Sequence, residues 1–235
     1  MRRHDIYTSD EHAESWCDGS KRWQRMLANQ VHVRMACFDR IDSRWEGLET
    51  LDLGCAGGYM AEVLARRGAR VVGIDPWMAA LKVACNHAWE SGLEDIHYLA
   101  GVGESLPLRD NSVDRVVCVD VLEHVNDLAK VLAEVRRVLR PGGMLFFDTV
   151  NRTWLSPLLV VTMAENVLRM LPRGTHDPSM FIRPDQLRSQ LESLGFQVSP
   201  MVGMGPALGI NRRLDSLFGK IPFTGVMYAG HALRG

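Results

Sequence analysis

The sequence predicts an α/β fold in which helices alternate with the strands of a mostly parallel sheet. Between residues 49 and 150, short apolar or β-branched runs take turns with segments that have helical spacing. Turns rich in glycine and proline, such as Pro141-Gly142-Gly143, separate the two kinds of segment. Strands that alternate with helices of this length are typical of βαβ units and of a parallel sheet.

The elements of this region follow one another in a regular order. The expected strands are 50–53, 69–74, 96–99, 113–119 and 144–150. The expected helices are 59–67, 78–89 and 127–139. The last of these helices has apolar residues at the spacing of one helical face, and it stops before Pro141 because proline and glycine end helices.

The C-terminal third is less regular. Residues 184–194 are expected to form a helix that Gly195 ends, and residues 196–201 and 226–233 are expected to be strands. No clear helix joins these two strands across the Gly- and Pro-rich stretch 203–225. We therefore predict that they pair as an antiparallel edge of the sheet.

The first part of the chain is expected to cover the sheet. Residues 20–42 have helical spacing, with an apolar stripe that includes Met35 and Phe38. We interpret residues 1–48 as a helical cap or lid and residues 49–235 as the main domain.

Composition excludes several classes of protein. The chain has 235 residues and a net charge of −1, so it can form one large core and lacks the basic excess of nucleic-acid-binding proteins. No uncharged apolar run is long enough to span a bilayer, and the N-terminus has no apolar signal segment. The five cysteines are widely spaced and odd in number, which argues for reduced thiols in a cytoplasmic protein.

A glycine-rich turn follows the first expected strand. The segment LDLGCAGG at 51–58 joins that strand to a helix, and small residues there let the backbone approach a ligand at the carboxyl edge of the sheet. Asp75 ends the next strand, where a carboxylate can accept both hydrogen bonds of a ribose diol. The pattern predicts a ligand that contains a ribose, and the alternative is a tight turn that binds nothing.

The ligand that fits this turn best is S-adenosylmethionine. The dinucleotide fingerprint G-x-G-x-x-G would fall on Gly54, Ala56 and Tyr59, so it fails at its second and third positions. Asp52 stands where a dinucleotide fold normally has an apolar residue, and an acid there suits a ligand with a positive amino group. S-adenosylmethionine has such an amino group and a ribose, and it has no phosphates.

Several segments resemble the class I S-adenosylmethionine-dependent methyltransferases, namely LDLGCAGG at 51–58, GID at 73–75 and VDVLEHV at 119–125. A more specific similarity is to the ubiquinone-biosynthesis O-methyltransferase group. It is carried above all by LRMLPRGTHDPSMFIRPDQL at 168–187, and also by FFDTVNR at 146–152 and ESWCD at 14–18. The resemblance implies a Rossmann-like, seven-stranded, mostly parallel sheet with helices on both faces and an antiparallel last strand.

The resemblance also implies S-adenosylmethionine as the methyl donor and S-adenosylhomocysteine as the product. Arg34 would meet the donor's carboxylate, and Gly54 would approach its methionine part. Asp75 would hold the ribose hydroxyls, and Val119 would contact the bound cofactor. The rest of the expected donor site is Asp52, Cys55, Ala56, Gly58 and Pro76, with Gly103 and Glu104 on the adenine side.

Three polar side chains follow the fourth strand. Asp120, Glu123 and His124 have the spacing i, i+3 and i+4, which would place them on one face of a helical turn beside the donor. Such a group suits a divalent cation, with Mg²⁺ or Zn²⁺ as candidates, and a cation would lower the pKa of a phenol. The resembled group has Glu-x-x-Glu-His here and is associated with a metal. The alternatives are acid–base catalysis by His124, support of the cofactor loop, and no role.

Residues 154–171 form an apolar segment whose central charges argue against a membrane-spanning helix. Ser156 and Pro157 can begin a helix, and Trp154 at one end suits an interfacial helix or a lid. The alternative is a helix buried on the core. In the resembled group an insertion here, at 152–185, is implicated in membrane contact. Trp154 and His176 are the expected acceptor-side residues, and for His176 alone a structural hydrogen bond is favoured over catalysis.

Taken together, these features predict an enzyme that methylates a phenol or catechol hydroxyl of an apolar small molecule. A divalent cation or a basic side chain would supply the oxyanion. One alternative is a secondary-metabolite methyltransferase with a hydroxyl, amine or carbon acceptor, because residues 200–235 match the ubiquinone group only loosely. Another is a donor-binding or membrane-associated partner without turnover. We expect no nucleic-acid partner and a cytoplasmic protein with peripheral membrane contact as an option, and the sequence leaves the oligomeric state open.

Overall fold

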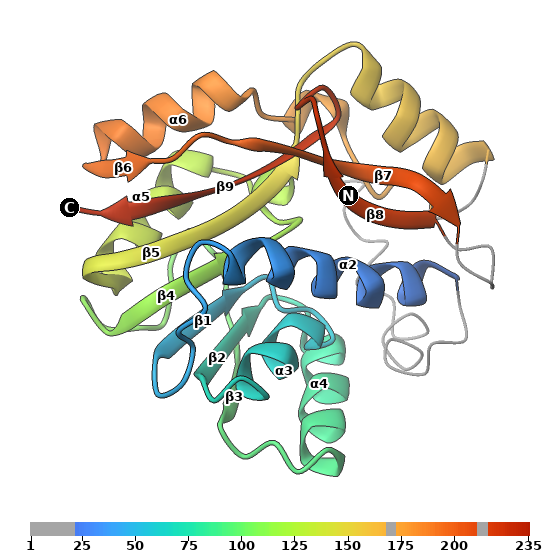
Figure 1. Ribbon diagram of the computed structural model, residues 1–235. Coiled ribbons are helices and arrows are strands. Elements are labelled where there is room, and N and C mark those ends of the chain that lie inside the picture. The colour runs from blue at the N-terminus through green and yellow to red at the C-terminus, as the bar shows by residue number, and fades with distance from the viewer. Residues whose placement is uncertain (1–21, 168–172, 211–215) are drawn as a thin grey trace.

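One mixed sheet organises the computed structural model, which describes residues 22–167, 173–210 and 216–235. Five parallel strands form one half of the sheet, in the spatial order β3-β2-β1-β4-β5 (Figure 1). Their bounds are β1 (Glu49–Leu53), β2 (Arg70–Asp75), β3 (Ile96–Ala100), β4 (Val113–Cys118) and β5 (Leu139–Val150). The predicted parallel α/β sheet is confirmed.

Antiparallel strands complete the sheet. β9 (Met227–Arg234) pairs with β5, and both β6 (Phe196–Val198) and β7 (Val202–Ile210) pair with the other edge of β9. The pairing of Phe196 with Arg234 confirms that the last two expected strands run antiparallel. Within the described residues the sheet has nine strands, which is more than the seven that the resemblance implied.

The additional strands form a hairpin that the sequence did not predict. β7 pairs with β8 (Ser216–Ile221), so a stretch in which we expected no strand extends the sheet. Its glycines weaken the strand pattern, but Gly203 is needed for packing, because a Cβ atom there would overlap the backbone carbonyl of Phe223. Glycine therefore makes β7 hard to recognise from the sequence and at the same time lets the backbone at Gly203 approach that at Phe223.

Helices cover both faces of the sheet, as predicted (Figure 1). One face carries α2 (Arg22–Asp39), α3 (Tyr59–Ala65) and α4 (Met78–Glu90), and the other carries α5 (Leu128–Val138) and α6 (Pro184–Ser193). Side chains of successive strand residues point to opposite faces of the sheet. Val117 and Phe146 join the apolar cluster of α2 and α3, whereas Val116 and Phe147 join that of α5 and α6.

The helix α2 packs directly on the sheet through its apolar stripe. Val31, Met35 and Phe38 are buried, and the ring centroid of Phe38 lies 4.8 Å from that of Phe146 in β5. Burying an apolar side chain of this size contributes about 1.5–3 kcal/mol, so this helix is anchored to the core. Residues 1–21 of the expected cap lie outside the described residues.

Short helical segments lie beyond the carboxyl ends of the strands. η2 (Leu122–His124) is a 3-10 turn after β4, and η3 (Pro157–Val167) is a π-helix after β5. η3 occupies most of the helix predicted over 154–171, whose last residues, 168–171, lie outside the described part of the chain. No helix among the described residues is long and apolar enough to cross a membrane.

The hairpin offers a direct test of the fold. Gly203→Ala should destabilise the protein by about 1–3 kcal/mol, because the new Cβ must displace backbone atoms at Phe223. Gly205→Ala is the matched control in the same strand, since its Cβ would lie 3.0 Å from Cδ1 of Ile221, the movable end of a side chain. Urea denaturation should show the lower midpoint for Gly203→Ala, and equal midpoints for the two variants would contradict the described packing.

Candidate active site

The glycine turn after β1 uses left-handed backbone conformations. Gly54 and Gly58 have φ angles of 76° and 87°, which glycine adopts without strain. Ala56 also has a positive φ, of 43°, although it carries a side chain. An alanine in this region costs about 1–2 kcal/mol, so contacts with the surrounding structure must hold the turn in place.

This turn packs against the segment that follows β4. A Cβ atom on Gly54 would overlap the side chain of Val121, so the glycine makes room for a neighbouring loop. The contact brings the expected donor-binding turn next to the η2 turn, which carries Glu123 and His124. Two groups of predicted site residues therefore meet at the carboxyl edge of the sheet, where ligands bind in open α/β folds.

Asp75 fastens the glycine turn to β2. Its Oδ2 accepts a hydrogen bond from the backbone N–H of Ala56 at 2.9 Å, and its Oδ1 accepts one from that of Trp77 at 2.8 Å. Burial raises the pKa of Asp75, and these two N–H groups oppose the rise. A carboxylate has further lone pairs, so Asp75 can hold the turn and still accept hydrogen bonds from ribose hydroxyls.

Asp52 presents an unsatisfied acceptor on the donor side. The residue is 1% exposed, and its Oδ2 has no hydrogen-bond partner among the described residues. Burial is the main cause that raises the pKa of Asp52 to about 7; the N–H of Ala61 opposes the rise and Asp75 adds to it. A buried carboxylate oxygen without a partner is unfavourable, so Asp52 fits the positive amino group of S-adenosylmethionine.

The other expected donor residues have diverse surroundings. Cys55 is buried, and burial raises the pKa of its thiol well above the usual value, so it acts as a small apolar residue. Glu104 accepts hydrogen bonds from the backbone N–H groups of Asn126 and Asp127, which ties its carboxylate to the loop before α5. Three further residues lie in the loops beyond the carboxyl ends of strands: Pro76 follows β2, Gly103 follows β3 and Val119 follows β4. Their contacts with the donor stay predictions.

Two carboxylates of this chain hold Arg34. Its Nε donates to Asp148 Oδ2 and its Nη2 to Asp120 Oδ2, both at 2.5 Å. Burial alone would lower the pKa of Arg34, but the two carboxylates outweigh burial and raise it, so the guanidinium stays charged. Contact between Arg34 and the donor's carboxylate stays a prediction. Asp148 lies in the FFDTVNR segment at 146–152, but sequence reasoning gave it no role, because its partners come from distant parts of the chain.

Asp120 departs from its predicted geometry. It has a positive φ of 54°, and its N–H donates to Asp148 Oδ1 at 2.8 Å. The chain therefore turns at Asp120 before η2 begins, and the expectation that Asp120, Glu123 and His124 share one helical face is wrong. The physical reason is that Asp120 pairs with Arg34 and Asp148 outside the helical turn.

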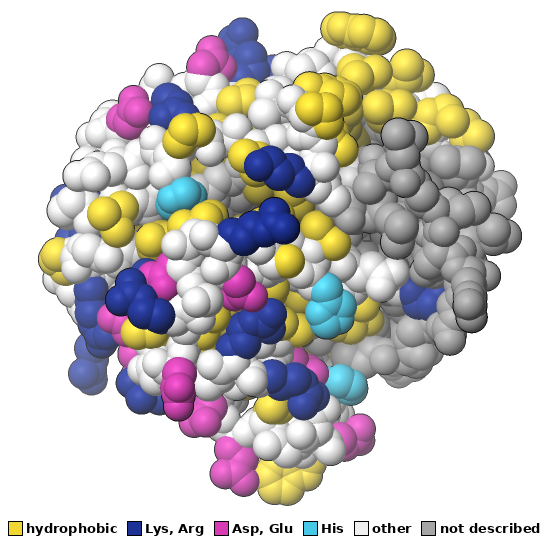
Figure 2. All heavy atoms as spheres, viewed as in Figure 1, with side chains coloured by type: hydrophobic (Ala, Val, Ile, Leu, Met, Phe, Trp, Pro, Cys, Tyr) yellow, Lys and Arg dark blue, Asp and Glu magenta, His cyan; other side chains and the backbone are white. Residues whose placement is uncertain are grey.

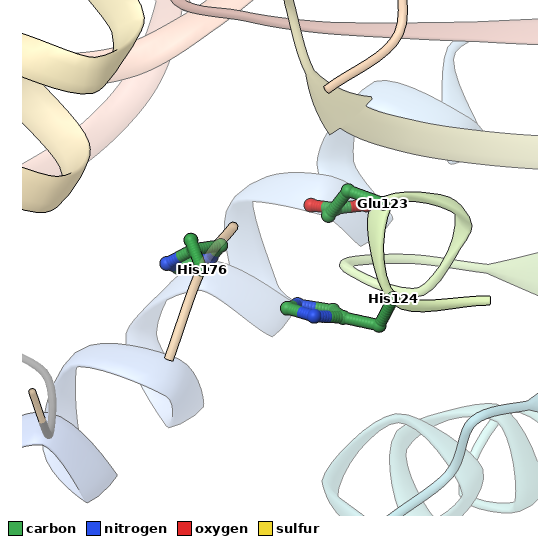
Figure 3. A group of neighbouring side chains, drawn as sticks. All are labelled: Glu123, His124 and His176. Carbon is green, nitrogen blue, oxygen red and sulfur yellow. The ribbon is translucent and has the colours of Figure 1, made fainter. Parts of the chain in front are cut away.

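A different residue, His176, joins Glu123 and His124 (Figure 3). One potential ligand atom from each of the three side chains lies within 4.8 Å of the others, and the two imidazole centroids are 5.2 Å apart. Figure 3 shows the Glu123 and His124 side chains extending toward His176, which comes from a separate segment of the chain. One carboxylate and two imidazoles suit a divalent cation such as Zn²⁺ or a proton relay.

The carboxylate of Glu123 is the buried part of this group. The residue is 1% exposed, and its Oε2 accepts a hydrogen bond from Thr149 Oγ1 at 2.8 Å. Its Oε1 has no hydrogen-bond partner in the described part of the chain. Burial, followed by repulsion from Asp120, raises the pKa of Glu123, and His176 opposes the rise. An unpartnered buried oxygen beside two imidazoles fits a bound cation or a shared proton.

The two expected acceptor residues lie in different surroundings. Trp154, which precedes η3, is 82% exposed, so its contact with an acceptor stays a prediction. His176 is held by the buried carboxylate of Glu165, which accepts from both Nδ1 and the backbone N–H of His176. The structural hydrogen bond expected of His176 is confirmed, but sequence reasoning missed Glu165 as the partner. The available signal was a glutamate that follows the apolar run 157–164.

Known proteins are similar to this chain in sequence and in fold. Residues 51–147 match a family described as a methyltransferase domain. The chain is 45% identical over 202 residues to a ubiquinone biosynthesis O-methyltransferase of Hahella chejuensis, covering 85% of this chain and 83% of that protein. It is 42% identical over 203 residues to the protein of that name from Thiobacillus denitrificans, covering 85% of each. A solved structure with a similar fold is the crystal structure of magnesium protoporphyrin IX methyltransferase (ChlM) from Synechocystis PCC 6803 with bound SAH. The TM-score is 0.70 at 18% identity, and the match covers 99% of this chain and 98% of that chain.

The raised pKa of Asp52 makes donor binding depend on pH. Below about pH 7 its carboxyl group is protonated and no longer attracts an ammonium group, which itself keeps its charge in this range. The association constant of S-adenosylhomocysteine, measured by calorimetry, should therefore rise about tenfold between about pH 5.5 and 7. Asp52→Asn should bind more weakly and show no such rise. A constant affinity of the wild-type chain over this range would contradict the role given to Asp52.

Proposed function

Since the chain belongs to the ubiquinone-biosynthesis family of S-adenosylmethionine-dependent O-methyltransferases, we propose that it methylates a phenolic hydroxyl group on an apolar small molecule. The names of the relatives support transfer to oxygen and an acceptor of the quinone type. The observation that carries the proposal is Oε1 of Glu123, which has no hydrogen-bond partner among the described residues and lies with His124 and His176. The segment after β4 that carries Glu123 and His124 packs against the glycine turn after β1. The net charge of −1 supports an uncharged acceptor rather than a nucleic acid.

The reaction is an in-line displacement at a sulfonium methyl group. The bond between the methyl carbon and sulfur breaks as the bond to the acceptor oxygen forms, and the phenol proton must leave so that the oxygen can attack. The chain would contribute the alignment of donor and acceptor, which supplies much of the rate enhancement in such reactions. Glu123, His124 and His176 would provide the route for the proton.

We propose that Glu123, His124 and His176 hold a divalent cation. When bound, such an ion lowers the pKa of a coordinated phenol and fixes its orientation. One carboxylate and two imidazoles are a ligand set that catalytic zinc sites use, whereas Mg²⁺ would depend more on Glu123. Asp120 is left out of this ligand set, because the described side chains whose ligand atoms lie within 4.8 Å of one another are Glu123, His124 and His176. The Oδ2 atom of Asp120 pairs instead with Arg34 at 2.5 Å. The alternative is that His124 accepts the phenol proton without an ion.

The outer face of η3 supports contact with an apolar acceptor or with a lipid surface. Five apolar side chains are exposed on or beside this helix: Trp154, Leu158, Leu159, Met163 and Val167. Figure 2 shows hydrophobic side chains gathered at the corner of the molecule that η3 occupies in Figure 1. We propose that residues 152–185 form a lid or a segment that binds peripherally to the membrane surface.

A methylation assay tests the proposed reaction. The purified protein, with S-adenosylmethionine labelled in its methyl group and a panel of prenylated phenols and catechols, should give O-methylated products identified by mass spectrometry. Glu123→Gln should lower kcat/KM by about 100-fold or more, because the group that assists loss of the phenol proton is changed. Glu62→Gln is the matched control, since Glu62 is also buried and also pairs with a histidine, His87, between α3 and α4.

Chelation in the same assay separates the two routes to the oxyanion. With the proposed ion, excess EDTA should abolish the activity, and Mg²⁺ or Zn²⁺ should restore it. Full activity in EDTA would remove the ion and leave His124 as the proton acceptor. The absence of O-methylation on every phenol of the panel would contradict the proposed function.

Vesicle sedimentation tests contact with lipid. Leu159→Asp should lower the fraction of protein bound to vesicles of phosphatidylcholine and phosphatidylglycerol, because burying a leucine contributes about 1.5–3 kcal/mol. Ile41→Asp is the matched control, since Leu159 and Ile41 are both 40% exposed and Ile41 follows α2 rather than η3. No binding by the wild-type chain, or equal losses in the two variants, would contradict contact through η3.

A further inference from the structure

We propose that Glu165 is a positioning residue that holds His176 in place to act together with Glu123 and His124. The inference rests on the proposed function, in which these three side chains hold a cation at the acceptor. Glu165 belongs to η3 and reaches the group through His176. It acts on the ligand set and does not touch the reacting atoms.

Glu165 accepts three hydrogen bonds from the segment that carries His176. Its Oε1 accepts from the backbone N–H of His176 at 3.0 Å and from its ring Nδ1 at 2.8 Å. Its Oε2 accepts from the backbone N–H of Gly174 at 2.8 Å. The Glu165 side chain is 0% exposed and that of His176 is 10% exposed. One buried carboxylate therefore fixes both the backbone and the ring orientation of His176.

This contact also selects the tautomer of His176. An ionised carboxylate can only accept hydrogen bonds, so Nδ1 of the neutral ring carries the hydrogen and Nε2 carries the lone pair. Histidines that bind metals commonly donate their other ring N–H to a carboxylate, which orients the ring and strengthens it as a ligand. Glu165 and His176 have this relation, and Glu123 and His124 are the remaining groups around the proposed ion.

The π-helical form of η3 explains how Glu165 reaches this position. Val160 and Glu165 are both buried although they are five residues apart. On an α-helix their side chains would point about 140° apart. A helix with hydrogen bonds between residues i and i+5 brings them to nearly the same face. That inner face packs on the core, where Val160 meets Val150 and Phe181, while the outer face of η3 stays exposed.

A charged residue in an apolar helix indicates a role beyond holding a loop. Taking a carboxylate out of water is unfavourable unless hydrogen bonds and a positive partner compensate for it. A neutral glutamine could accept hydrogen bonds from backbone N–H groups with less loss of hydration. The negative charge of Glu165 matters at the ring of His176, because it favours the tautomer with hydrogen on Nδ1 and makes Nε2 a stronger ligand than a neutral glutamine would.

Cobalt binding tests this role of Glu165. The full-length protein is titrated with Co²⁺, whose visible absorption reports the ligands around the ion. Glu165→Gln keeps the size of the side chain and removes its charge, and the dissociation constant for Co²⁺ should rise by about 10–100-fold. Glu62→Gln removes the charge of another buried carboxylate that pairs with a histidine, and it should leave the constant unchanged. An equal constant in Glu165→Gln and wild type would overturn the proposal.

The tautomer of His176 gives a second measurement that does not depend on how a Glu165 variant folds. Long-range ¹⁵N–¹H NMR of the metal-free protein should show the form with hydrogen on Nδ1. A predominant form with hydrogen on Nε2 would overturn the proposal, because its Nδ1 could not donate to Glu165. If the wild-type chain binds no Co²⁺, the proposed cation and this inference fail together. O-methylation by the same preparation then decides separately whether the proposed reaction stands.

Discussion

A buried arginine and its two carboxylates hold the functional edge of this fold together. Arg34 comes from α2, Asp148 from β5, and Asp120 from the chain just after β4, and the guanidinium pairs with both acids at 2.5 Å. Removing one partner from a buried ion pair leaves an uncompensated charge and costs about 3–5 kcal/mol. Three distant parts of the chain are therefore fixed at one point. Because Asp148 also accepts the N–H of Asp120, the η2 turn with Glu123 starts from a fixed residue.

The buried carboxylates at this edge of the sheet differ in whether both of their oxygens accept hydrogen bonds. Asp75 and Glu165 accept hydrogen bonds on both of their oxygens and thereby hold loops. Asp52 and Glu123 each keep one oxygen without a hydrogen-bond partner among the described residues. We assign the unsatisfied oxygen of Asp52 to the binding of the positively charged donor and that of Glu123 to the acceptor side. The packing of the glycine turn on the segment after β4 joins the two sides, so the fold presents both reactants at one edge.

Local patterns in the sequence were sufficient for the parallel strands and for the donor side. Asp52, Gly54 and Asp75 could be predicted because a turn and two strand ends place them, and each role depends on nearby chain. Contacts between distant segments could not be predicted in this way. His176 and Glu123 are far apart in the sequence and meet only in the folded chain. The positive φ of Asp120 accompanies its contacts with α2 and β5. The hairpin of β7 and β8 needs the open edge of β9, which no local pattern reports.

The most direct test of this account is a crystal structure of the protein with S-adenosylhomocysteine and Mn²⁺, in which anomalous scattering locates the ion. We expect the amino group of the ligand to lie within hydrogen-bond distance of Asp52 Oδ2. We also expect an ion bound by Glu123, His124 and His176, with Asp120 still paired to Arg34. An ion bound by Asp120 in place of His176, or an amino group away from Asp52, would contradict it.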